Sequence, residues 1–310
     1  MFGLLNIDKP LGLTSRDVVN RVQRLVRPDK AGHAGTLDPL ADGVLVVCIG
    51  QATRLIEYVQ QMPKRYEATF RLGQWSESCD LECEPVTVAD APRPTDAEIE
   101  AVLPEFTGLI QQRPPAHSAI RVQGKRAFDL ARQGHEVELA ARPVMIYELR
   151  VVAYKYPELK LDIRCGSGTY VRSLGRDLAE RLGTAAVMSQ LTRTEIGVFR
   201  LDDAAELDAL VDLPSIERAL LPARNAISAL PHVMLDAAEI ERIRRGQFLD
   251  LTAERMRPPA VDSRSESATL EPARLETAPR ELAALDEQHE LVAILAPHRS
   301  GQWKPHRNLA

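Results

Sequence analysis

GHAGTLDPLADG, residues 32–43, places the carboxylate of Asp38 in an unusual local setting. Asp38 lies between a glycine-rich turn and Pro39, whose ring crowds the α region of the residue before it and so favours extended backbone. The apolar, β-branched run 44–49 follows directly and predicts a buried strand. An Asp on a loop between rigid elements is typical of catalytic groups. An Asp before Pro also forms ordinary Asx-turns, so this simpler interpretation stays open here.

Periodic patterns predict the elements around this loop. Residues 4–7 form an apolar strand, and Thr14 or Ser15 caps a helix with valines at helical spacing. Apolar and polar side chains alternate over residues 64–72, which predicts a strand whose buried face begins at Tyr66. Tyr66 is therefore either a core residue or an aromatic at the edge of a site. Further strands are expected over 144–156, 159–165, 188–191, 196–201 and 291–295, with residues 192–195 as the connection between two of them. Helices are expected over 51–59, from Thr95 onward and over 237–245.

An arginine at the start of a helix points to a partner for Asp38. The turn Gly166-Ser167-Gly168 leads into a helix predicted over 171–182. Arg172 lies in its first turn, where the helix dipole disfavours a cation. We therefore expect Arg172 to have a specific anionic partner, and Asp38 is our choice.

The charge and cysteine content narrow the class of protein. The net charge is −5, but residues 76–105 hold nine acidic residues and one basic one, so the rest carries +3 and can meet phosphates. Cys79 and Cys83 lie too far in sequence from other ligand types to suggest zinc, and reduced thiols are expected. No apolar run is long enough to span a membrane, and no signal peptide is recognisable, which predicts a cytoplasmic protein.

Two segments depart from the periodic pattern. Residues 111–143 are basic and poorly periodic, which is typical of a binding loop, although a surface excursion with incidental arginines would look the same. Residues 252–289 are rich in Pro, Ala, Arg, Glu and Ser and contain no aromatic residue. Such a composition predicts disorder.

Three motifs resemble those of the bacterial tRNA pseudouridine-55 synthases (TruB-type enzymes). They are residues 32–47, Gly168-Thr169-Tyr170-Val171-Arg172 and Lys9-Pro10-x-Gly12-x-Thr14-Ser15. The resemblance implies an α+β fold, with a catalytic domain (1–225) on a mixed, largely antiparallel sheet with flanking helices and a small PUA-like RNA-binding β domain (230–310). Residues 111–143 would be the thumb that grips the T loop of tRNA, and 252–289 a disordered insertion. It further implies a cytoplasmic monomer that isomerises uridine 55 of tRNA by base flipping, without metal or cofactor.

The same resemblance implies a role for each site residue. Asp38 is the catalytic carboxylate, acting either as a nucleophile at C1′ or as a base for the C2′ proton. Arg172 keeps it ionised, and Tyr170 is a second aromatic that can carry a proton for C5. Tyr66 stacks on the uracil. The remaining substrate-binding residues are His33, which fills the space left by the flipped base, Leu191, an apolar wall, and the basic residues Lys9, Arg121, Lys125 and Arg126.

Other interpretations remain open. Asp42 puts a second acid beside Asp38, so either carboxylate could be implicated by a mutant. A catalytically silent protein that binds or folds tRNA could share the fold, although intact Asp38, Tyr66 and Arg172 argue against it. A small-molecule enzyme that holds a nucleotide at the glycine turns is disfavoured, because the lysine of a P-loop is missing.

Overall fold

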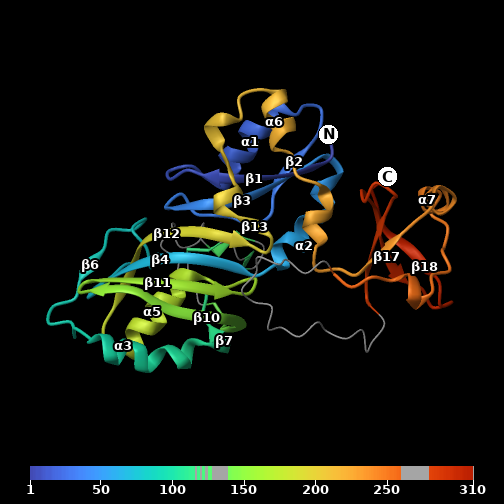
Figure 1. Cartoon of the computed structure of the whole chain (residues 1–310). Helices are drawn as coiled ribbons and strands as arrows, with labels where there is room; N and C mark the ends of the chain where they lie inside the picture. The colour runs from blue at the N-terminus through green and yellow to red at the C-terminus, as the bar shows by residue number, and fades with distance from the viewer. Residues whose placement is uncertain (116, 119–120, 123–124, 128–138, 260–278, 310) are drawn as a thin grey trace.

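A ten-stranded mixed sheet forms the centre of the chain (Figure 1). The computed structural model describes residues 1–115, 117–118, 121–122, 125–127, 139–259 and 279–309. Among the described strands, only the β1–β14 and β3–β12 pairs of this sheet are parallel, which confirms the expected mixed, largely antiparallel architecture. Its path runs β14 (Ala205–Glu206), β1 (Gly3–Lys9), β3 (Ala41–Ile49), β12 (Ala186–Ile196), β4 (Lys64–Leu72), β11 (Glu158–Cys165), β10 (Arg142–Lys155) and β7 (Gly108–Gln112), with β2 (Ala31–His33) on β3 and β13 (Phe199–Arg200) on β12.

Helices cover both ends of this sheet. Figure 1 shows α1 (Ser15–Leu25) and α6 (Leu213–Ala219) over the β1–β3 end, and α3 (Asp96–Val102) and α5 (Val171–Arg181) beside β11 and β10. Thr14 and Thr95 form capping boxes that start α1 and α3. The start at Thr95 was predicted, and of the two caps considered for α1, Thr14 or Ser15, the structure has Thr14. The expected helix over 51–59 is split into a 3-10 turn (Gly50–Leu55) and α2 (Ile56–Gln61).

The predicted alternation of β4 is observed and explains how α5 packs. Tyr66, Ala68 and Phe70 point into one core, while the residues between them are more exposed. Helix α5 lies so close to this face that a methyl group on Gly175 would be 2.0 Å from the Phe70 ring. A small residue at 175 therefore sets the distance between the helix that carries Arg172 and the sheet.

The prediction of two strands joined by residues 192–195 is wrong. β12 runs without a break through these residues. Thr192 and Arg193 pair with β3 on one side and with β4 on the other. Because β12 lies inside the sheet with a partner on each side, the polar stretch stays in the ladder although its composition suggests a connection.

A second, four-stranded sheet lies in the C-terminal part (Figure 1). It contains β15 (His232–Met234), β16 (Leu282–Leu285), β17 (Leu291–Pro297) and β18 (Trp303–Asn308), with α7 (Ala237–Arg244). One face builds a separate core around Val233, Leu249 and Trp303. Side chains of the other face, such as Ile294, join a cluster with Leu4 and Val44 of the first sheet. The division at residues 225–230 remains a proposal.

The prediction of disorder over 252–289 is wrong at both ends. A 3-10 turn spans Ala253–Arg255, and Arg257 exchanges backbone hydrogen bonds with His232. β16 is completely buried between β15 and β17, because its short alanine- and leucine-containing run acquires strand partners only in the folded chain. Residues 260–278 lie outside the described residues.

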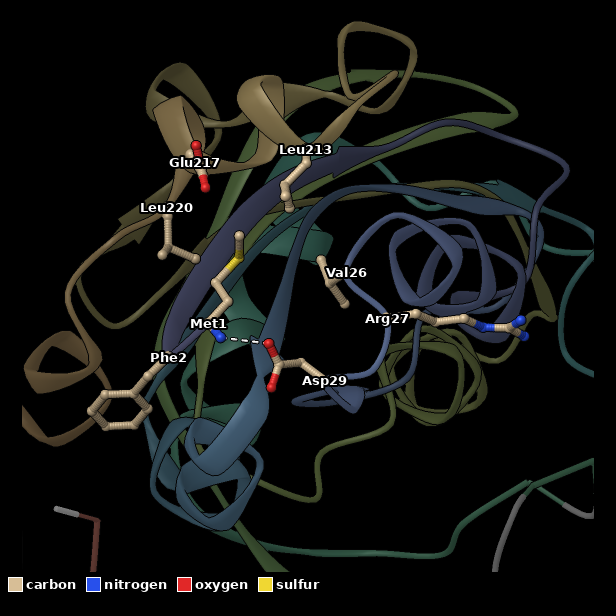
Figure 2. A pocket seen from close by; sticks show the side chains of 8 residues that line it. All are labelled: Met1, Phe2, Val26, Arg27, Asp29, Leu213, Glu217 and Leu220. Atoms are coloured by element: carbon tan, nitrogen blue, oxygen red, sulfur yellow. Dashed lines mark hydrogen bonds and ion pairs between the residues drawn. The ribbon is translucent and has the colours of Figure 1, made fainter.

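Short strands and a pocket complete the description. β5 (Gln74–Trp75) pairs with β6 (Val86–Thr87), and β8 (Arg121–Val122) pairs with β9 (Lys125–Arg126). A pocket of about 370 Å3 lies where the N-terminal amine of Met1 forms an ion pair with Asp29 (Figure 2). None of the predicted site residues lines it. Among the residues described, no helix has both the length and the apolar character that crossing a membrane requires.

Candidate active site

The loop that carries Asp38 is held by the segment around Thr14. Ser15 Oγ accepts a hydrogen bond from the backbone N–H of Leu37 (2.8 Å) and donates to its carbonyl (3.1 Å). Gly12 N–H donates to the carbonyl of Pro39 at 2.8 Å. Ala41 N–H donates to the carbonyl of Asp38 at 3.0 Å and closes a turn. The carboxylate is therefore presented by a loop whose backbone is bonded to residues 12–15 just before and just after Asp38.

Arg193 supports the other side of this loop and was missed by the sequence interpretation. Its side chain is buried, with Nε donating to the Val44 carbonyl (2.7 Å) and Nη2 to the Gly35 carbonyl (3.2 Å). Gly43 has φ +92°, and a Cβ there would lie 2.3 Å from the carbonyl oxygen of Arg193. The glycine is thus required both for its backbone conformation and for the close approach of β12.

The predicted ion pair between Arg172 and Asp38 is present. Arg172 Nη2 lies 3.1 Å from Asp38 Oδ2, and the Arg172 side chain is only 7% exposed while that of Asp38 is 39% exposed. The guanidinium also contacts Asp80 Oδ2 through Nη1 at 3.1 Å. One arginine therefore joins an accessible carboxylate to a buried one.

Arg172 makes two further bonds that fix its plane. Nη1 donates to the carbonyl of Ser78 at 3.0 Å, and Nη2 donates to the carbonyl of His117 at 3.1 Å. Asp80 in turn accepts from the Glu82 N–H at 2.9 Å. Asp80 was not expected from the sequence, where it belongs to an acidic stretch that reads as a solvated loop.

Two opposing effects act on the ionisation of Asp38. Burial raises the pKa of Asp38 above its ordinary value, and the Arg172 guanidinium opposes this shift by favouring the ionised form. The negative charges of Asp80 and Glu82 add to the rise in the Asp38 pKa. Arg172 thus works against the tendency of this site to hold Asp38 in its neutral form.

Apolar side chains gather on the strands next to the loop. Tyr66 and Leu191 belong to one buried cluster with Leu37 and Ala41. Leu191 on β12 is aligned with Ala41 on β3, just after the Asp38 loop. Burial raises the pKa of Tyr66, so its phenol stays neutral at ordinary pH. Both earlier interpretations of Tyr66, as core and as an aromatic near the carboxylate, fit this position.

Tyr170 occupies the position before the first turn of α5. Its backbone N–H donates to Gln112 Oε1 (2.8 Å), and its carbonyl accepts from Gln112 Nε2 (3.1 Å). The Arg142 guanidinium lies over the Tyr170 ring, 5.1 Å from its centroid, and donates to the Gly168 carbonyl at 2.6 Å. The glycine turn is therefore bonded to this arginine, and Gln112 is a positioning residue with no recognisable sequence signal.

Two further predicted residues, His33 and Lys9, lie at different places. His33 ends β2 and is partly buried, and burial and the Arg16 charge lower its pKa. Lys9 is completely buried with Nζ bonded to the carbonyls of Pro10 (2.8 Å) and Leu13 (2.7 Å). The prediction that Lys9 contacts substrate therefore fails, because its ammonium group is used to hold the turn that supports the Asp38 loop.

Asp42 lies on β3, where it is aligned with Thr192 of the neighbouring strand β12. Its charge acts on two neighbours in β1. It adds to the burial that raises the pKa of Asp8, and it opposes the burial that lowers the pKa of Lys9. No ion pair between Asp42 and Arg172 is found among the described residues. The carboxylate that meets Arg172 in the loop is that of Asp38.

The predicted thumb residues are only partly described. β8 and β9 form a short antiparallel ladder in which Arg121 is aligned with Arg126 and Val122 with Lys125. The structure does not describe the side chains of Arg121, Lys125 and Arg126. The basic residue Arg132 of the same segment lies wholly outside the described residues. Their contact with RNA remains a prediction.

Known proteins are similar to this chain over most of its length. Residues 23–171 match the family described as TruB family pseudouridylate synthase (N terminal domain). The chain is 41% identical to tRNA pseudouridine synthase B of Rhodopirellula baltica over 98% of its length and 94% of the relative. It is 43% identical to the protein of the same name from Synechocystis over 80% of its length and 86% of the relative.

Solved structures share the fold. A Cbf5-Nop10-Gar1 complex contains a chain with 26% identity and a TM-score of 0.69 over 96% of this chain and 78% of that one. A chain of an H/ACA RNP bound to a substrate RNA containing 2′-deoxyuridine matches with a TM-score of 0.71 over 100% of this chain and 85% of that one; at 23% identity it supports the fold alone. The relatives at 41–43% identity and the family match over residues 23–171 establish that the chain belongs to the TruB family of pseudouridylate synthases.

Proposed function

We propose that this protein converts uridine 55 in the T loop of tRNA to pseudouridine. The observation that carries the proposal is the Asp38–Arg172 ion pair, in which an accessible carboxylate is held by a buried guanidinium. Relatives covering nearly the whole chain are named tRNA pseudouridine synthase B, which supports tRNA as the substrate. The reaction is an isomerisation and needs no net oxidation or reduction.

The chemistry requires one ionised carboxylate beside the sugar. The uracil N1–C1′ bond breaks, the base turns, and a C5–C1′ bond forms while the C5 proton leaves and N1 takes up a proton. Asp38 can attack C1′ directly or remove the C2′ proton, and both routes need the ionised form. Arg172 serves either route because its charge favours the ionised carboxylate and its four bonds fix the direction of approach.

The detached base must be retained while it turns. A stacked aromatic can hold a uracil without fixing its angle, and we assign this role to Tyr66, with Leu191 as the apolar wall. Tyr170, whose ring lies beneath the Arg142 guanidinium, is the proposed carrier of the C5 proton. His33, whose pKa is lowered, is proposed to enter the RNA as a neutral ring where the flipped nucleotide leaves a space.

Recognition of the T arm is assigned to the segment 111–143 and to the C-terminal sheet. Arg121, Lys125 and Arg126 give the first of these a basic character suited to phosphates. We propose the catalytic unit 1–225 and a PUA-like unit 230–310, and a monomeric protein acting in the cytoplasm. These assignments follow from the family resemblance and from the strand pairing of β15 to β18.

The decisive variant is Asp38→Asn, with Asp42→Asn as its matched control. With an unmodified T-arm transcript, Asp38→Asn is expected to form no pseudouridine while its tRNA affinity stays within about tenfold, because the carboxylate contributes to chemistry and not to binding. Asp42→Asn should retain turnover. Substantial turnover by Asp38→Asn would transfer the role to another carboxylate. Binding without any product from the unaltered protein would favour a catalytically silent tRNA-binding protein.

A further inference from the structure

Three potential metal ligands from distant parts of the sequence meet beside the Arg172 site. They are Glu77, Cys83 and His117, and one ligand atom of each lies within 4.8 Å of the other two. Cys83 is a free thiol, partly buried, and Glu77 is exposed. The earlier reason for rejecting zinc, that Cys83 is isolated from other ligand types, does not hold, because the fold brings His117 to it across 34 positions.

We propose that Glu77, Cys83 and His117 form a binding site for a zinc ion. A thiolate, an imidazole and a carboxylate together are a ligand set that suits Zn2+ and does not suit Mg2+ or Ca2+, which prefer oxygen alone. Three protein ligands leave the fourth tetrahedral position for water. The exposed Glu77 side gives the ion a path of entry from solvent.

The distances require only side-chain movement. With metal–ligand bonds of about 2.0–2.3 Å, the ligand atoms of a tetrahedral site lie about 3.3–3.6 Å apart. The observed limit of 4.8 Å therefore has to shrink by no more than about 1.5 Å.

The backbone of the ligand-bearing loop is already arranged. Cys83 N–H donates to Ser78 Oγ at 3.1 Å, and Ser76 Oγ donates to the Asp80 carbonyl at 2.6 Å. Met188 N–H of β12 donates to the Cys79 carbonyl at 3.0 Å. The loop is therefore tied to itself and to the central sheet, and Glu77 and Cys83 project from a preformed turn.

The site also connects to the catalytic ion pair through backbone. Arg172 donates to the carbonyl of Ser78 on the loop and to the carbonyl of His117. A zinc ion that joins Glu77 and Cys83 to His117 would link the two segments that supply these carbonyls. Zinc binding is thus expected to raise the melting temperature and to hold Arg172 in the plane that meets Asp38.

The test uses Co2+ as a spectroscopic substitute for Zn2+ in the full chain. The unaltered protein should bind one equivalent and develop the intense near-ultraviolet absorption of a thiolate–cobalt bond, and Zn2+ should abolish it. Cys83→Ser should lose this band, and Cys79→Ser, a matched change in the same loop, should keep it. Glu77→Gln, at an exposed position where folding is not at risk, should weaken Co2+ affinity by at least about tenfold.

Three results would overturn the proposal. One is the absence of a thiolate–cobalt band in the unaltered protein. Another is a band that survives Cys83→Ser or that depends on Cys79. The third is Co2+ affinity that remains unchanged in Glu77→Gln and in His117→Gln. Each of these readouts is independent of pseudouridine formation, so the zinc site and the enzymatic activity are tested separately.

Discussion

Asp80→Asn is the most informative single substitution, because it should make the protein less stable and yet more active in acid. Asp80 is almost fully buried, contacts Arg172 Nη1 through Oδ2 at 3.1 Å and accepts from the Glu82 N–H through Oδ1 at 2.9 Å. A carboxylate accepts at both oxygens, whereas an amide accepts at one and donates at the other. One of the two contacts therefore becomes donor against donor.

The loss of stability follows from these contacts. Losing one hydrogen bond to a charged group in a buried site costs about 1.5–3 kcal/mol. Leaving a buried charge with no partner at all costs more, about 3–5 kcal/mol. The cost here is smaller, because Arg172 retains its ion pair with Asp38 and its hydrogen bonds to two backbone carbonyls. The matched control is Glu105→Gln, which breaks an exposed ion pair with Arg181 and should change stability far less, because solvent screens exposed pairs.

The pH dependence should move in the opposite sense from stability. The negative charge of Asp80 raises the pKa of Asp38, so its removal lowers that pKa. More Asp38 is then ionised at a given acidic pH, and the acid limb of the single-turnover rate moves to lower pH. Arg172→Gln removes the charge that lowers the Asp38 pKa and should move the limb to higher pH.

The acid limb of the pH dependence can be measured in single-turnover experiments. The assay follows the release of tritium from tRNA labelled at uracil C5 at a series of pH values. Denaturant unfolding of the same samples gives the change in free energy. If the acid limb of Asp80→Asn stays in place or moves to higher pH, the ionisation of Asp38 does not control the rate, and the electrostatic account of the site is refuted.

The remaining predictions address packing, the loop segments and RNA binding. Gly175→Ala should destabilise the chain by about 1–3 kcal/mol or more, measured by denaturant unfolding, because its methyl group would overlap the Phe70 ring; Gly166→Ala, also at a glycine without positive φ but with no atom closer than 3.4 Å to the added Cβ, is the control. Deleting residues 260–278, which keeps β16, should leave the melting temperature unchanged, since this stretch has no aromatic residue and no apolar face; a cooperative loss of structure would contradict this. Replacing Arg121, Lys125 and Arg126 together by Ala should weaken tRNA binding and flatten its dependence on salt by up to about three phosphate contacts, with little change in the rate at saturating tRNA; if both survive, RNA is gripped elsewhere.

Local patterns were sufficient for much of the fold. The alternation over 64–72 predicted β4 and its buried face. The helix starts at Thr95 and at Thr14 or Ser15 were also predicted, because caps depend on hydrogen bonds within a few residues. The Asp38–Arg172 pair could also be predicted, since an arginine in the first turn of a helix conflicts with the dipole and implies an anion nearby.

Tertiary structure decided the rest, because the contacts involved join residues far apart in sequence. Arg172 and Ser78 are 94 positions apart, and Arg193 and Val44 are 149 apart, so no local periodicity marks Asp80 or Arg193 as part of the site. β16 is a strand because β15 and β17 pair with it, although its surroundings have the composition of a disordered segment. Likewise Cys83 and His117 become neighbours only when the acidic loop is tied to β12 and the chain returns past Arg172.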